Sequence, residues 1–85
     1  MSYHLTKIPQ GVYGEISKIE EELAELKDAS EQQCKIMVLC ELSDLIGAIE
    51  GYLLKYHPNF TLDDLLLMKD ITSNAFKSGS RKSKE

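Results

Sequence analysis

The residues of this chain that could do chemistry are acidic, and they occur in two groups with helical spacing. Glu22 and Glu25 lie three residues apart in the acidic run EEELAE, and Glu41 and Asp44 lie three residues apart in ELSD. On a helix, residues with this spacing are neighbours on one face. Two carboxylates so placed repel each other unless a proton or a cation lies between them, so each pair is a candidate half of a cation site.

The two pairs differ in their surroundings. An acidic run near a helix start is favoured by the helix dipole, so a solvated face remains the alternative for Glu22 and Glu25. Glu41 and Asp44 instead share a helical sector with small or apolar residues, namely Cys34, Met37, Ala48 and Tyr52. Carboxylates at positions that the pattern would otherwise bury are costly unless they are paired or bound to metal. Oxygen ligands on facing helices suit Mg²⁺, with Mn²⁺ as the second choice.

Other kinds of site find little support. Cys34 and Cys40 lie six residues apart and would point in different directions on one helix, so we interpret them as two small buried hydrophobic residues. His4 and His57 have no partner at ligand spacing, which argues against zinc. The sequence contains no Glu-x-x-His motif for a di-iron centre, no glycine-rich phosphate loop and no nucleophile elbow.

Charge is distributed unevenly along the chain. Residues 77–85 hold four basic residues and one acid, a net charge of +3, whereas residues 1–76 hold six basic and thirteen acidic residues, a net charge of −7. With this negative charge, residues 1–76 repel nucleic acid and free triphosphates unless a bound cation offsets the repulsion. We therefore expect no nucleic-acid partner. Residues 77–85 are predicted to be a basic flexible tail, with phosphate contact as the alternative.

The elements that must position the acids are helices. Apolar residues at spacings of three and four predict a first helix over about 15–28, and a segment rich in Ile, Met, Val and Leu predicts a second over about 31–56. Pro58 ends the second helix, because the residue before a proline leaves the α region. Thr61 and Asp64 have the spacing of a capping box, which predicts the start of a third helix that stops near residues 76–79. Its inward positions are expected to be Leu65, Met68, Ile71 or Thr72, and Ala75.

The whole chain is therefore predicted to be a single all-α domain, a helical hairpin plus a third helix. At 85 residues one domain is the most that can form. Residues 1–13, which include Pro9 and Gly11, are predicted to be an N-terminal loop. No apolar run approaches the roughly 18 residues of a membrane span, and residues 1–7 lack the apolar stretch of a signal peptide. This predicts a cytoplasmic protein with no membrane partner.

The two acidic motifs, in this order on two helices, resemble those of the all-α nucleoside triphosphate pyrophosphohydrolases of the MazG type. Residues 21–25 (EELAE) match E-E-x-x-E, and residues 41–44 (ELSD) match E-x-x-D, with 15 residues between the motifs. The resemblance covers about residues 11–76. The short chain looks like the compact single-domain versions carried by bacteriophages, for which the location would be the host cytoplasm.

The resemblance implies an activity and a set of ligands. It implies hydrolysis of a nucleoside triphosphate between the α and β phosphates, which releases a nucleoside monophosphate and pyrophosphate. The matching positions imply Mg²⁺ held by Glu22, Glu25, Glu41 and Asp44. We expect one glutamate of the first motif, Glu22 or Glu25, to act as the catalytic residue that holds or deprotonates the attacking water.

The resemblance also indicates where the nucleotide would be contacted. Relatives place basic and amide residues on the last helix for this purpose, and the candidates here are Lys69, Asn74, Lys77 and Arg81. An ordinary exposed residue remains the alternative for each.

Assembly is expected as well, because three helices of this length present more apolar surface than one protomer of 85 residues can cover. Gly47 and Gly51 would let another helix approach the second helix closely. The resemblance implies four-helix bundles formed by paired protomers, so we predict a homodimer or tetramer with the second helix central. The rival hypothesis is a non-catalytic helical interaction or adaptor protein whose acidic faces are solvated.

Overall fold

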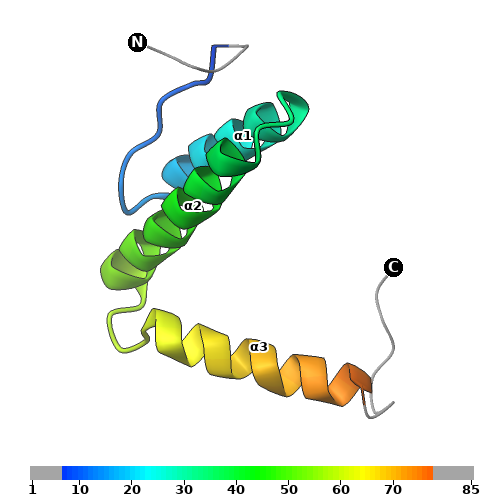
Figure 1. The fold of residues 1–85 in the computed structure, drawn as a ribbon. Helices are drawn as coiled ribbons and strands as arrows, with labels where there is room; N and C mark the ends of the chain where they lie inside the picture. Colours follow the sequence, from blue (N-terminus) through cyan, green and yellow to red (C-terminus); the bar gives the residue numbers. More distant parts are fainter. Residues whose placement is uncertain (1–6, 78–85) are drawn as a thin grey trace.

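The computed structural model describes residues 7–77, which form three α-helices and no strand. Helix α1 spans Ile16–Glu31, α2 spans Lys35–Tyr56 and α3 spans Leu62–Lys77. Helices α1 and α2 run antiparallel as a hairpin, and α3 leaves the end of α2 at a steep angle (Figure 1). The predicted all-α class, a helical hairpin plus a third helix, is confirmed.

The turn of the hairpin lies three to four residues later than the spacing of apolar residues predicts. Helix α1 continues to Glu31 and α2 begins only at Lys35. Gln33 has a φ of 58°, in the left-handed region, which breaks the helical path between the two helices. Cys34 therefore precedes α2 instead of lying within it. Cys40 is exposed, so its interpretation as a buried residue is wrong.

The start of α3 is the predicted capping box. The backbone N–H of Asp64 donates to Thr61 Oγ1 at 3.3 Å, and the backbone N–H of Thr61 donates to Asp64 Oδ2 at 2.8 Å. These reciprocal bonds satisfy backbone donors that the first turn leaves without helical partners. Residues 57–61 thus redirect the chain from α2 into α3.

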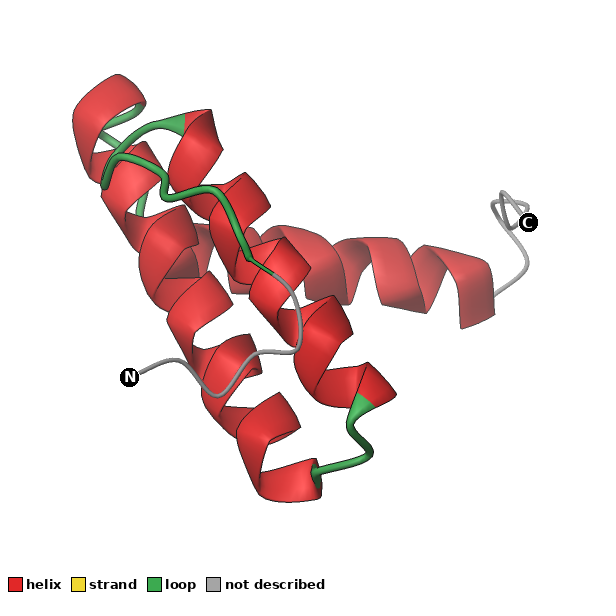
Figure 2. Cartoon of the chain, turned by 90° about the horizontal axis from the view of Figure 1, so that it is seen from above, coloured by secondary structure: helices red, strands yellow, loops and turns green. Residues whose placement is uncertain are grey.

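Helix α3 packs on the hairpin only near its own start. Leu65, Thr72 and Ala75 are half-buried, but Met68 and Ile71 are 57% and 61% exposed. The inward orientation expected for Met68 is therefore wrong within the protomer, and of the two alternatives Ile71 and Thr72 only Thr72 is half-buried. The reason is the direction of α3, which extends away from α1 and α2 in both ribbon views (Figures 1 and 2).

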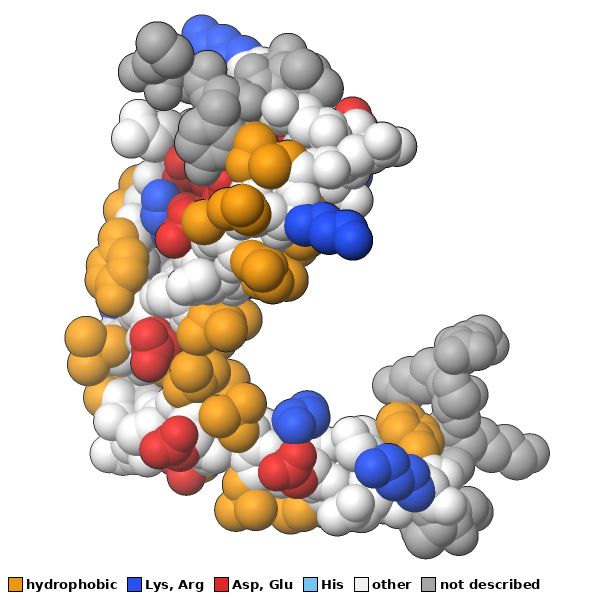
Figure 3. Space-filling model, in the orientation of Figure 1, with side chains coloured by type: hydrophobic (Ala, Val, Ile, Leu, Met, Phe, Trp, Pro, Cys, Tyr) orange, Lys and Arg blue, Asp and Glu red, His pale blue; other side chains and the backbone are white. Residues whose placement is uncertain are grey.

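The protomer has a very small apolar core. Among the described residues, the buried hydrophobic side chains are those of Ala29, Ala48 and Leu53. Many large apolar side chains are exposed instead, and they cover much of the hairpin and part of α3 (Figure 3). On α2 the exposed ones include Ile36, Leu39, Leu42, Ile46 and Leu54. Large exposed apolar patches are typical of interaction surfaces.

The segment before α1, residues 7–14, forms a strap that runs back along the hairpin (Figures 1 and 2). The Val12 N–H donates to Ser17 Oγ at 3.1 Å, and the Tyr13 ring lies against Gly51 of α2. Gly11 lies so close to α1 that an added Cβ would come within 2.2 Å of the Ser17 carbonyl oxygen. Gly14, with a φ of 90°, turns the chain into the helix. The strap is therefore a loop, as predicted, and is attached to both hairpin helices.

Gly47 and Gly51 differ in what surrounds them. The Tyr13 ring already covers Gly51, whereas nothing lies within 4 Å of a Cβ added at Gly47. Within the protomer only Gly47 therefore remains open to another helix.

None of the helices within residues 7–77 combines the length and the apolar character that crossing a bilayer requires.

Candidate metal centre

The hairpin brings together the four acids that the two motifs predict as ligands. Oxygen atoms from Glu22, Glu41 and Asp44 lie within 4.8 Å of one another, and so do oxygen atoms from Glu21, Glu22 and Glu25. Glu22 belongs to both groups and therefore links the acids of α1 to those of α2. We call these five residues the acidic cluster.

The acidic cluster runs from the interior of the hairpin to its surface. Glu41 has no exposed surface and Glu22 is 4% exposed, while Glu25 is half-buried and Asp44 is exposed. The cluster is thus closed on the side of Glu41 and open to solvent on the side of Asp44. A site of this kind excludes water from some of its carboxylates and leaves an entrance for a ligand.

The two carboxylate oxygens of Glu22 differ in whether they have a partner. Glu22 Oε2 lies 3.0 Å from the ammonium nitrogen of Lys18. Glu22 Oε1 is buried and has no hydrogen-bond partner among the described residues. A buried carboxylate oxygen without a partner is costly, and a bound cation is one way to offset that cost.

Glu25 shows the electrostatic consequence of crowding the acids. The pKa of Glu25 is raised to about 7, chiefly by burial and in addition by the closeness of the Glu22 carboxyl and the negative charges of Glu22, Glu41 and Glu21. Near neutral pH the metal-free cluster therefore holds a proton at Glu25 for much of the time. A divalent cation would displace that proton.

Glu21 belongs to the cluster although sequence reasoning does not place it among the four ligands. Its Oε1 atom accepts the Gly11 N–H at 3.0 Å and the Lys18 ammonium at 2.9 Å. The hydrogen bond from Gly11 lowers the pKa of Glu21, and the bond from Lys18 acts in the same direction, against the opposing effect of burial. The signal available in the sequence is the first position of E-E-x-x-E, but its link to Gly11 depends on the path of the strap.

The residues predicted to contact the nucleotide lie elsewhere in the protomer. Lys69 and Asn74 are exposed on α3, which extends away from the hairpin, and Lys69 forms an ion pair with Asp70 at 2.6 Å (Figure 1). Arg81 lies outside the described residues. Within one protomer, Lys69 and Asn74 are therefore not brought to the acidic cluster.

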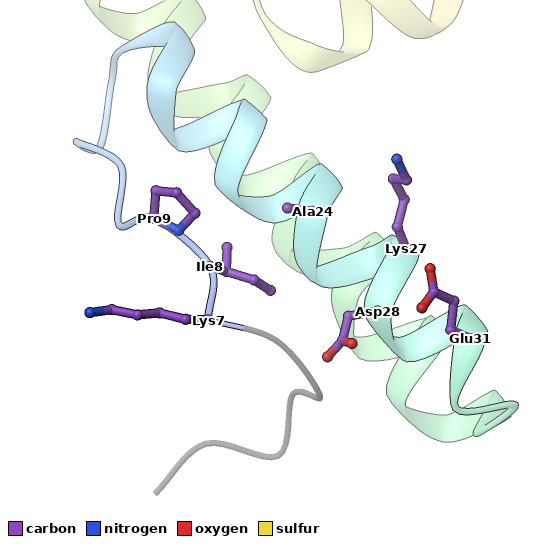
Figure 4. Close-up of a pocket in the computed structure, with 7 residues that line it drawn as sticks. All are labelled: Lys7, Ile8, Pro9, Ala24, Lys27, Asp28 and Glu31. Atoms are coloured by element: carbon purple, nitrogen blue, oxygen red, sulfur yellow. The ribbon is translucent and has the colours of Figure 1, made fainter.

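Two of the pockets formed by the described residues lie outside the cluster. One, of about 260 Å³, separates the strap from the second half of α1 and is lined by side chains of both charges, including Lys7, Lys27 and Glu31 (Figure 4). The other, of about 390 Å³, is at the corner between α2 and α3 and is lined mainly by apolar residues: Ile49, Tyr52, Leu53, His57, Phe60, Leu65 and Met68. Neither pocket contains a member of the acidic cluster.

The donor set fits a hard divalent cation. Its ligand atoms are all carboxylate oxygens, and neither group of acids includes a histidine or a cysteine. Mg²⁺ and Mn²⁺ prefer such ligands, whereas zinc sites use nitrogen or sulfur.

Comparisons of the chain with protein-family models, with curated proteins and with solved structures gave no match.

Proposed function

We propose that this chain is a Mg²⁺-dependent nucleoside triphosphate pyrophosphohydrolase that releases a nucleoside monophosphate and pyrophosphate. The observation that carries the proposal is the convergence of acids from two helices on Glu22, whose buried Oε1 atom has no hydrogen-bond partner among residues 7–77. The two motifs predict this set of acids from their spacing, and the resemblance to MazG-type enzymes supplies the reaction.

The side chains of the cluster have distinct parts in this proposal. Glu22, Glu41 and Asp44 would hold the cation together with Glu25. When bound, a divalent cation neutralises phosphate charge and activates water. Of the two glutamates of the first motif, the half-buried Glu25 is more accessible than Glu22, and it would hold or deprotonate the attacking water. One water then cleaves the α–β anhydride, and pyrophosphate is the leaving group.

We also propose that the active form is a homodimer or a tetramer, with α2 central to the interface and the nucleotide sites near the subunit boundary. Support comes from the exposed apolar side chains of α2 and from the open surface at Gly47. The direction of α3 also supports an oligomer. Because α3 extends away from its own hairpin, Lys69 and Asn74 of one copy could approach the acids of another.

The test is a pyrophosphate-release assay. Purified protein is incubated with a panel of ribo- and deoxyribonucleoside triphosphates and Mg²⁺ or Mn²⁺, with and without excess chelator. We expect turnover that requires the metal. Glu41→Gln is expected to reduce it at least about 100-fold, while Glu50→Gln, an exposed acid on the same helix, leaves it within twofold. Full activity in excess chelator would contradict the proposal.

The second candidate is a helical interaction or adaptor protein, and the large exposed apolar surface favours it. On that reading the acids are only surface charge. Two results together would support it: no pyrophosphate release from any triphosphate, and no binding of Mn²⁺ by the folded protein.

A further inference from the structure

Lys18 lies at a position of α1 where a lysine does not favour the helix. It lies in the first turn of α1, which contains no acidic residue. A cation at the N-terminus of a helix is opposed by the helix dipole. Its order relative to the glutamates, with the lysine nearer the N-terminus, is also the less favourable one for ion pairs along a helix.

The contacts of Lys18 point instead to the acidic cluster. Its ammonium nitrogen lies 2.9 Å from Glu21 Oε1 and 3.0 Å from Glu22 Oε2, and the side chain is 27% exposed. The two partners are themselves largely buried, with side chains 12% and 6% exposed.

We propose that Lys18 is a positioning residue for metal binding: it holds Glu22 by one oxygen and leaves the other oxygen directed to the cation. The inference rests on the proposed metal-dependent function. Because Lys18 occupies Oε2 and the buried Oε1 has no hydrogen-bond partner among the described residues, a lysine and a cation can share Glu22 without competing for one atom.

The strap fixes Lys18 in turn. Glu21 Oε1 accepts both Lys18 and the Gly11 N–H, and Gly11 lies against the backbone at Ser17 with no room for a side chain. The path from Gly11 through Glu21 and Lys18 to Glu22 is therefore a continuous set of hydrogen bonds from the strap to the cluster. Partners that orient a metal ligand in this way typically contribute 10- to 100-fold to metal affinity.

The test measures metal binding in the absence of nucleotide. Mn²⁺ is titrated into the full chain and the free ion is followed by electron paramagnetic resonance, with circular dichroism to verify helicity. We expect Lys18→Met and Lys18→Gln to bind Mn²⁺ about tenfold more weakly than the wild type. Lys18→Arg, which keeps the charge and the donors, should restore affinity to within about threefold. Lys27→Met, which removes an exposed lysine from the same helix, is the matched control and should bind normally.

The outcomes separate this inference from the proposed function. If the wild type binds Mn²⁺ and both Lys18→Met and Lys18→Gln bind it as tightly or more tightly, the positioning role is overturned and the metal site remains. If Lys18→Arg binds Mn²⁺ as weakly as Lys18→Met and Lys18→Gln, the positioning role is overturned too. Restoring the charge and the donors would then have no effect, which indicates a role in packing alone. A folded wild type that binds no Mn²⁺ would overturn both proposals.

Discussion

At the scale of single residues, the cluster is governed by the cost of gathering carboxylates where water is scarce. Glu41 has no exposed surface and Glu22 has almost none, yet both belong to one group of three acids. Such groups are retained in a folded protein when protons, lysines or metal ions offset their repulsion. In this hairpin Lys18 and the proton at Glu25 perform that role in the absence of metal.

The first prediction concerns pH and Glu25. Its pKa is raised from an ordinary value of 4.5 to about 7, so the folded chain binds more protons than the unfolded chain between these two values. The stability of the metal-free protein should therefore fall as pH rises from about 4.5 to about 7. Urea unfolding at several pH values in chelator measures this slope.

The comparison that isolates Glu25 is Glu25→Gln. Because glutamine does not titrate, the loss of stability across this window should be smaller in the variant than in the wild type. Equal slopes in the two proteins would show that the raised pKa of Glu25 has no energetic consequence.

The second prediction concerns the stability of Glu41→Gln. Replacing one acid of this crowded group by an amide of nearly the same shape relieves repulsion between the carboxylates, so we expect Glu41→Gln to be neutral or stabilising by about 1 kcal/mol in the absence of metal. Added Mg²⁺ should then stabilise the wild type and not the variant, because ligand binding adds to the free energy of unfolding. Thermal melts followed by circular dichroism measure both effects. A variant that no longer folds in chelator would mean that Glu41 is structural.

At the scale of elements, the strap is the part that joins α1 and α2 from outside the hairpin. It is attached at three places: Gly11 to Glu21, Val12 to Ser17, and Tyr13 to Gly51. Beyond it, Glu15 at the start of α1 forms an ion pair with Lys55 and accepts a hydrogen bond from Tyr56, both at the end of α2. These contacts fix the register of the two helices that carry the acids.

The third prediction tests the strap through Gly11→Ala. The added Cβ would collide with the backbone of α1 at the Ser17 carbonyl, so the strap must shift and lose its bond to Glu21. We expect a loss of about 1–3 kcal/mol in the free energy of unfolding, measured with urea. Gln10→Ala, at an exposed neighbouring position, is the control and should change it by less than about 0.5 kcal/mol. A Gly11→Ala variant as stable as the wild type would mean that the strap is not held at this point.

At the scale of the whole molecule, the shortage of core is the dominant fact. The three buried hydrophobic residues found within residues 7–77 are a small core for three helices, and α3 in particular has little to pack against. A helix of 16 residues is marginal in water on its own. The exposed apolar side chains of α2 and α3 are therefore expected to be covered by a second copy of the chain.

The fourth prediction follows from this shortage. Light scattering at micromolar concentration should give a mass at least twice that of the 9.6 kDa protomer. Gly47 offers a sharper test, because alanine there would stabilise an isolated helix by about 1 kcal/mol. If another helix packs against Gly47, the added methyl group should instead weaken the oligomer. A folded, fully active 9.6 kDa monomer would contradict the prediction.

Local spacing in the sequence determines the elements and the pairing of acids within each helix. The interval of three residues puts Glu22 beside Glu25 and Glu41 beside Asp44, and the capping box at Thr61 follows from two residues of the right type. These features depend on neighbours in the chain, which is why the sequence is sufficient to predict them.

Tertiary structure alone decided the rest of the site and the shape of the molecule. The left-handed Gln33 set where the hairpin turns, and the packing of α1 on α2 left Glu41 fully buried and Asp44 exposed. The strap added Glu21 to the acids through its bond from Gly11. Helix α3, which contains Lys69, extends away from the hairpin that holds the acids. Each of these outcomes depends on contacts between residues distant in the chain. The spacing of apolar residues along one helix does not show which face of another helix will pack against it.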